Sequence, residues 1–148
     1  MAGASLNITG LTTVKQTFNS LQSLDVNDLL IDIGEAYHDD VLARFDSEQA
    51  PDGTKWKKSQ RAIDTGDKTM TDSAILRGSF HYEIAGKQLL YGSPEVYLAV
   101  HNFGGFAGKR LATKIPQREV IGISARQLRI VDDAATNFLN EALSWLKP

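Results

Sequence analysis

Residues 27–48 read NDLLIDIGEAYHDDVLARFDSE, and this segment sets the architecture of the chain. Its apolar side chains recur at the three- and four-residue intervals of an α-helix, which places them on one face that must be buried. The opposite face is acidic, so the pattern predicts a long helix to about Glu48, capped by Asp25 or Asn27. The apolar positions are Leu29, Leu30, Ile33, Ala36, Tyr37, Val41 and Phe45, and the acidic ones are Asp28, Asp32, Glu35, Asp39 and Asp46.

Patterns before this segment predict a short strand and a first helix. Residues 5–9 alternate polar and apolar side chains, as a half-buried strand does. Val14, Phe18 and Leu21 then recur at helical intervals, which predicts about three helical turns ending near Leu24.

Patterns after the long helix predict a hairpin, one helical turn and a C-terminal helix. Apolar and polar residues alternate over 80–84, and a turn at Gly86 leads into 88–91, which is typical of a β-hairpin. Residues 96–101 are expected to form a single helical turn. Ser124 caps a C-terminal helical region in which Asp132-Asp133 is a candidate interruption.

Two long segments, 49–74 and 102–118, lack periodicity and are predicted to be loops. Connections of this length are usually functional or disordered. The second segment places Lys109, Arg110 and Lys114 among apolar side chains. The expected fold is α+β: a small antiparallel sheet packed against the long N-terminal helix and the C-terminal helix, with two long loops.

Length and composition indicate one globular domain over residues 1–148. The chain has 148 residues, of which 42% are hydrophobic and 23% charged. It contains no cysteine, which excludes disulfides, cysteine-ligated metals and thiol catalysis. No apolar run reaches the roughly 18 residues of a membrane span.

Charge is distributed unevenly along the chain. Residues 1–52 hold nine acidic and two basic side chains, whereas 53–130 hold thirteen basic and six acidic ones. Such asymmetry is typical of a chain that meets a charged partner or a copy of itself, although solvated surfaces give the same pattern.

The sequence offers no pattern of catalytic or cofactor-binding residues. GGFAGKR at 104–110 resembles a phosphate-binding loop, but it is one residue too short, and Arg110 stands where Ser or Thr must ligate magnesium. The three histidines are far apart in the sequence and none has a second ligand at helical spacing. We therefore expect no enzyme activity, no metal and no cofactor.

Four short motifs, in order, give the chain a family resemblance. They are FDSEQAPDGTKW at 45–56, LRGSF at 76–80, YLAVHNFGG at 97–105 and IPQR at 115–118. Together they resemble the phage virion morphogenesis family, which includes tail-completion proteins of contractile-tailed temperate phages and counterparts in Mu-like phages. The likeness runs from about Leu6 to Trp145.

The resemblance implies a structural protein of the neck or tail top, forming a ring that completes the tail and supports head–tail joining. It implies no catalysis. The expected partners are further copies of the chain, with a hexamer as one candidate, and tail-tube, tail-terminator or head-completion proteins. The protein is then expected in the host cytoplasm during assembly and afterwards in the virion, without membrane contact and with DNA only passing through the ring.

The candidate interface consists of two patches of opposite charge, which a head-to-tail ring would bring together. Trp56 is either an interface anchor or a lid on its own core, and Arg118 is a candidate for a bidentate contact with a neighbouring carboxylate. The acidic patch is Asp32, Glu35 and Asp39; the other patch is Lys57, Lys58, Arg61, Lys109 and Arg110, with Phe106 beside it.

An alternative function is that of a DNA-binding accessory protein. Lys55, Lys57, Lys58 and Arg61 surround Trp56, and such a combination can hold phosphates and stack a base. The pI of about 5.9 and the acidic helix oppose it, because DNA would repel most of the molecule.

Overall fold

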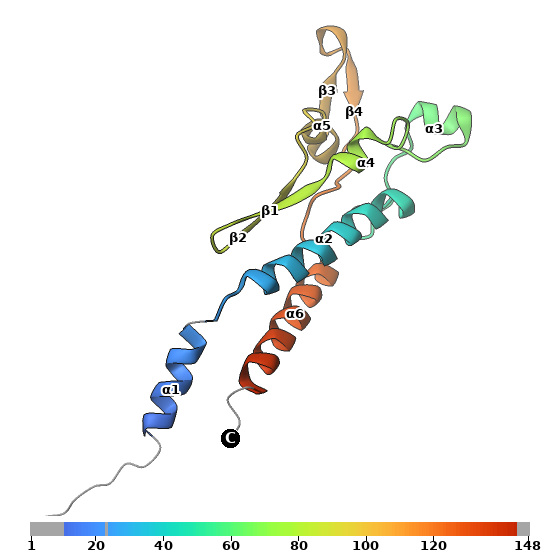
Figure 1. The fold of residues 1–148 in the computed structure, drawn as a ribbon. Coiled ribbons are helices and arrows are strands. Elements are labelled where there is room, and N and C mark those ends of the chain that lie inside the picture. Colours follow the sequence, from blue (N-terminus) through green and yellow to red (C-terminus); the bar gives the residue numbers. More distant parts are fainter. Residues whose placement is uncertain (1–10, 23, 145–148) are drawn as a thin grey trace, which may run out of the picture.

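A long helix, α2, is the spine on which the other elements are arranged (Figure 1). The computed structural model describes residues 11–22 and 24–144. Its mixed helices and small antiparallel sheets confirm the predicted α+β class. The elements are α1 (Leu11–Gln22), α2 (Asn27–Ser47), α3 (Gln60–Thr65), α4 (Ile75–Ser79), β1 (His81–Ala85), β2 (Gln88–Gly92), α5 (Leu98–Phe103), β3 (Gly105–Ala107), the 3₁₀ turn η1 (Lys109–Leu111), β4 (Thr113–Ile115) and α6 (Ala125–Ser144).

The predicted long helix is confirmed, and it packs against both α6 and the β1–β2 hairpin. It ends at Glu48, which takes a left-handed conformation with φ of 53° and donates its N–H to the Arg44 carbonyl. Gly34 lies on the face turned to β1, where a Cβ atom would stand 2.8 Å from Cδ2 of Tyr82. The missing side chain at Gly34 therefore lets the hairpin approach the helix closely.

The predicted β1–β2 hairpin is also confirmed. Tyr82 pairs with Tyr91 and Ile84 with Leu89, and these four side chains lie on the half-buried face. Gly86 in the turn has φ of +64°, a conformation that favours glycine.

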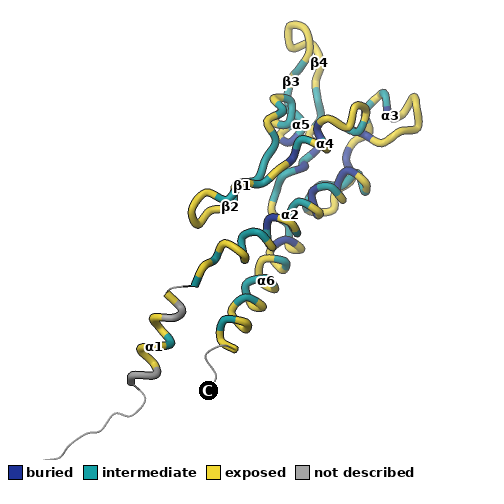
Figure 2. The backbone as a smooth tube through the Cα atoms, viewed as in Figure 1, coloured by how far each residue is buried: buried dark blue, intermediate teal, exposed yellow. Residues whose placement is uncertain are grey.

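The buried core is small and lies where α2, α4 and the segment before α6 meet (Figure 2). The Phe45 ring meets Trp56 edge-on at 5.6 Å between ring centroids and Phe80 at 5.9 Å. Of the two alternatives for Trp56, the structure shows the core position: the side chain is 6% exposed, and its Nε1 donates to the Glu119 carbonyl at 3.0 Å. The buried apolar residues of this cluster are Val41, Phe45, Trp56, Leu76, Phe80 and Val120.

The segment 49–74 contains a helix that the sequence did not indicate. Ser59 caps α3 by accepting a hydrogen bond from the Ala62 N–H. The fully buried Thr69 donates its backbone N–H to the Glu48 carboxylate at 2.8 Å. Because polar contacts to side chains organise this segment, no apolar periodicity marks it.

The segment 102–118 contains a second hairpin, formed by β3 and β4 with η1 between them. Its strands are only three residues long, which is too short for alternation to be recognised. The C-terminal helix is confirmed, but α6 runs unbroken through Asp132 and Asp133, whose exposed charges are solvated. The strand predicted at 5–9 lies outside the described residues.

Candidate functional site

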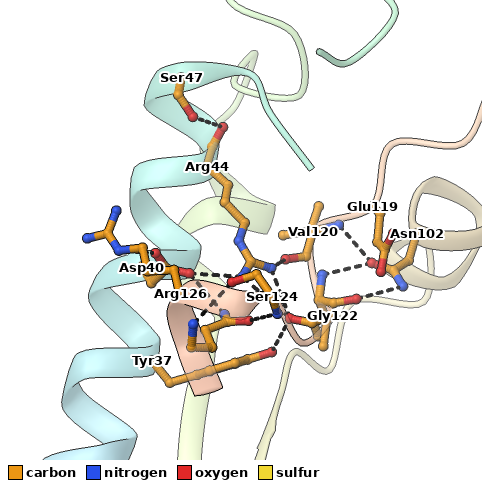
Figure 3. A network of polar contacts seen from close by, with 12 residues as sticks. Tyr37, Asp40, Arg44, Ser47, Asn102, Glu119, Val120, Gly122, Ser124 and Arg126 are labelled. Atoms are coloured by element: carbon orange, nitrogen blue, oxygen red, sulfur yellow. Dashed lines mark hydrogen bonds and ion pairs between the residues drawn. The ribbon is translucent and has the colours of Figure 1, made fainter. Parts of the chain in front are cut away.

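A buried ion pair fastens α2 to the segment that leads into α6 (Figure 3). Arg44 is 5% exposed, and its Nη2 donates to Oδ2 of Asp40 at 2.9 Å, one turn earlier on the helix. The Arg44 guanidinium also donates to the carbonyls of Val120 and Gly122. Arg126 reaches the other oxygen of Asp40, with its Nε at 3.3 Å from Oδ1.

Two amides also hold this segment: Asn102 from the side away from α2, and Gln127 from the side of the ion pair. Oδ1 of Asn102 accepts the N–H groups of Val120 and Ile121, both at 2.8 Å, and its Nδ2 donates to the Ile121 carbonyl at 3.2 Å. Gln127 and Ser124 form a capping box at the start of α6, each side chain accepting the other's backbone N–H. Gln127 Nε2 also donates to Asp40 at 2.9 Å, which ties this cap to the ion pair.

The motif residues therefore act mainly as a scaffold. Phe45, Trp56 and Phe80 form the core, and Asn102 positions residues 120–121. Arg118 is 5% exposed, and its Nε donates to the Lys57 carbonyl at 2.7 Å. Its observed partner is thus a backbone carbonyl of its own chain, in place of the predicted carboxylate, because the side chain points inward.

His101 lies beside this scaffold and is partly buried. Its Nδ1 is enclosed and has no hydrogen-bond partner among the described residues. Its ring meets that of Tyr97 edge-on, with centroids 6.4 Å apart. Burial, together with the nearby Arg118 charge, lowers the pKa of His101 below its usual value.

The structure leaves the predicted acidic residues accessible. Asp32, Glu35 and Asp39 are all exposed on α2. Asp32 lines a groove between the first half of α2 and residues 130–141 of α6, whereas Glu35 and Asp39 do not line it.

The predicted basic residues do not form one patch. Arg61 is engaged within its own loop, with Nη1 at 2.9 Å from Asp67 and Nε at 3.6 Å from Asp72. Lys109 and Arg110 lie in the turn of the β3–β4 hairpin, which projects away from α3 (Figure 1). Lys57 and Lys58 are exposed just before α3, so the basic side chains are divided between two projections.

The groove between α2 and α6 is the feature that sequence reasoning missed. It encloses about 460 Å³, and its floor is made of the half-buried Ala36, Ile130, Ala134 and Phe138. The exposed side chains at its rim are Asp28, Asp32, Asn137, Asp133 and Glu141. The spacing of the two aspartates on α2 was visible in the sequence, but the pairing of the two helices was not.

Large apolar side chains are exposed over much of the surface. Val96 is 90% exposed and Phe103 75% exposed, next to an apolar groove of about 380 Å³ beside α5. Leu128, Leu139 and Leu143 are also exposed along α6. Exposed apolar surface of this extent is typical of a protein that binds other proteins.

The described part of the chain holds no group of three His, Cys, Asp or Glu side chains arranged for a metal ion. Across residues 11–22 and 24–144, no helix has the length and apolar character needed to span a membrane.

The comparison with known families gives the class of protein. The family model described as the phage virion morphogenesis family matches residues 9–140. The chain therefore belongs to this family, and its role lies in the assembly of bacteriophage virions. Neither the curated proteins nor the solved structures gave a match.

Proposed function

We propose that the protein is a structural component of the neck or tail top, whose copies form a closed ring that completes the tail and supports head–tail joining. The observation that carries this proposal is the separation of surfaces on an elongated body. The acidic groove of α2 and α6 lies toward one end, and the basic β3–β4 hairpin projects at the other (Figure 1). Complementary patches at opposite ends support head-to-tail association.

The family supports this role, and the polar network supports a function without catalysis. The buried polar groups Asp40, Arg44, Asn102 and Gln127 are bonded to one another or to the backbone and hold the fold together. The exposed apolar side chains provide contact area for further partners. Tail-tube, tail-terminator and head-completion proteins are the proposed partners, and the virion is the proposed final location.

Disruption of the gene in its phage tests the proposal. We expect separate heads and tails in electron micrographs, and joined particles again when the intact gene is supplied in trans. An antibody against the protein should label the neck or tail top. Infectious, properly joined particles that lack the protein would contradict the proposal.

DNA binding is a second candidate function, favoured by one observation. No acidic residue occurs between Val96 and Arg118, and Lys109, Arg110 and Lys114 in this segment are exposed. DNA binding predicts retention on DNA with a steep salt dependence, reduced when Lys109 and Arg110, or Lys57 and Lys58, are neutralised. If the protein supports assembly but is not retained on DNA, DNA binding is excluded and the structural role is the function that remains.

A further inference from the structure

The end of the β3–β4 hairpin combines positive charge with exposed apolar surface. Phe106 is 59% exposed and Leu111 65% exposed, although both are large apolar side chains. Arg110 and Leu111 take left-handed conformations, with φ of 58° and 54°, which non-glycine residues rarely adopt. Strain of this kind concentrates at functional sites. We define the hairpin tip as Phe106, Lys109, Arg110, Leu111 and Lys114.

The helix groove has the complementary properties. We define it as the groove between α2 and α6 described above, with an apolar floor and an acidic rim. Four carboxylates line it, and none of its lining residues is basic. An occupant with apolar side chains and positive charges would cover the floor and neutralise the rim.

The tip of one chain cannot fill its own groove, because the two lie toward opposite ends of the molecule (Figure 1). We propose that the hairpin tip of one copy inserts into the helix groove of a second copy. Phe106 and Leu111 cover the apolar floor, and Lys109, Arg110 and Lys114 face the acidic rim. This inference rests on the proposed head-to-tail assembly and gives it a specific interface.

Charge favours the hairpin tip over helix α1, another described segment at the groove's end of the molecule (Figure 1). Helix α1 joins the start of α2 and has the exposed apolar side chains Val14 and Phe18, but Lys15 is its one charged residue. The hairpin tip has three positive charges for the four carboxylates. Because the interface joins two different surfaces, each added copy exposes a new tip and a new groove, and association continues until a ring closes.

Cysteine cross-linking tests the contact directly, because the natural chain has no cysteine. Purified Leu111→Cys and Asn137→Cys chains, mixed under mild oxidation, should give a disulfide-linked heterodimer. A chain with both substitutions should give a ladder of multimers. Leu111→Cys mixed with Lys87→Cys, an exposed site at the β1–β2 turn, is the matched control and should give little product.

Three cross-linking outcomes would overturn the inference. The first is no more product than the control pair gives. The second is tip-to-tip dimers of Leu111→Cys as the main product. The third is an internal disulfide between Phe18→Cys and Asn137→Cys within one chain, which would show that α1 occupies the groove.

Charge reversal supplies a second test by mass measurement in solution. Lys109→Glu with Arg110→Glu, or Asp133→Lys with Glu141→Lys, should each weaken self-association at least about tenfold, since each places like charges at the contact. All four substitutions in one chain should restore it. Lys57→Glu with Lys58→Glu is the control and should leave it unchanged.

Failure of this interface is distinguishable from failure of the proposed function. If the protein is found at the neck but neither test links tip to groove, the inference is wrong and the function stands. A wild-type chain that stays monomeric at all concentrations and gives no cross-link contradicts the inference whatever the phage experiment shows. If the chain with all four substitutions does not recover self-association, charge pairing between the hairpin tip and the helix groove is excluded.

Discussion

Arg44 shows how single residues hold this small protein together. Its guanidinium is buried, and Asp40 is the carboxylate that balances its charge. Removing one partner of a buried ion pair leaves the other charge without compensation, which costs far more than the pair itself contributes. Because Asp40 also accepts from Gln127 and pairs with Arg126, the same carboxylate connects α2 to the start of α6.

Asp40→Asn is therefore expected to lower the free energy of unfolding by about 3 kcal/mol. The reason is that the neutral amide leaves Arg44 buried without a counter-charge. Denaturant unfolding of the purified chain measures the change. Asp39→Asn is the matched control: Asp39 is exposed, so its effect should stay within about 0.5 kcal/mol. Equal effects of the two substitutions would contradict the structural role given to Asp40.

Gly34→Ala is expected to destabilise the protein by about 1–2 kcal/mol, although alanine favours helix formation. The new methyl group would lie 2.8 Å from the Tyr82 ring and force the hairpin away from α2. Gly78→Ala in α4 is the control, because a Cβ there meets open space, and it should be neutral or slightly stabilising. Thermal unfolding compares them, and a more stable Gly34→Ala chain would refute the close approach.

His101 predicts a dependence of stability on pH. Burial, with the Arg118 charge, lowers its pKa in the folded state, so the unfolded state binds more protons below about pH 6.5. The free energy of unfolding should therefore fall as pH drops from 7.5 to about 5. His101→Gln should reduce this slope relative to the wild-type chain. Unfolding curves at several pH values measure the slopes, and identical slopes would reject this account.

At the scale of elements, the sequence predicted what helical and strand periodicity can specify. The long run of apolar spacing in α2 and the turn at Gly86 each indicated one element, and both were confirmed. The three-residue strands β3 and β4 and the six-residue α3 are too short to show a period. Side-chain hydrogen bonds such as the Ser59 cap support α3, and a pattern of hydrophobicity does not report them.

The candidate site, too, could be predicted only in part from the sequence. Sequence alone indicated Asp32 and the basic residues Lys109 and Arg110, because charge is visible residue by residue. It did not indicate the helix groove, whose floor joins Ala36 of α2 to Phe138 of α6 over about a hundred residues of sequence. Nor could it exclude Trp56 and Arg118 from the surface, because their burial depends on tertiary packing.

Ser124→Ala is expected to destabilise the start of α6 and to cost about 1 kcal/mol of global stability. The hydroxyl accepts the Gln127 N–H, and alanine would leave that N–H without its partner. Compared with the wild-type chain, the Ser124→Ala chain should show faster hydrogen exchange in the first turn of α6, with a smaller change in α2. Ser144→Ala, at the exposed end of the same helix, is the control. Unchanged exchange in the first turn would show that the capping box does not hold this end.

At the scale of the whole molecule, the proposed head-to-tail contact would make each copy depend on two neighbours. Under this proposal, a chain carrying Lys109→Glu and Arg110→Glu keeps its helix groove and is expected to accept a wild-type hairpin tip. Its own tip then faces a wild-type acidic groove, where like charges repel and assembly stops. Such a copy is thus expected to enter assemblies and prevent their closure, which makes the defect dominant over the wild-type protein.

Co-expression of this tip-reversed chain during infection tests that expectation. If rings close only from wild-type copies, the yield of joined particles should fall as the wild-type fraction raised to the number of copies in the ring, much more steeply than in proportion. The chain with all four reversals is the matched control: its tip and groove fit each other but neither fits the wild-type surfaces, so it should not interfere. A yield that falls only in proportion to the wild-type fraction would mean that the tip-reversed chain never joins the ring, against the interface that the charges and the groove support.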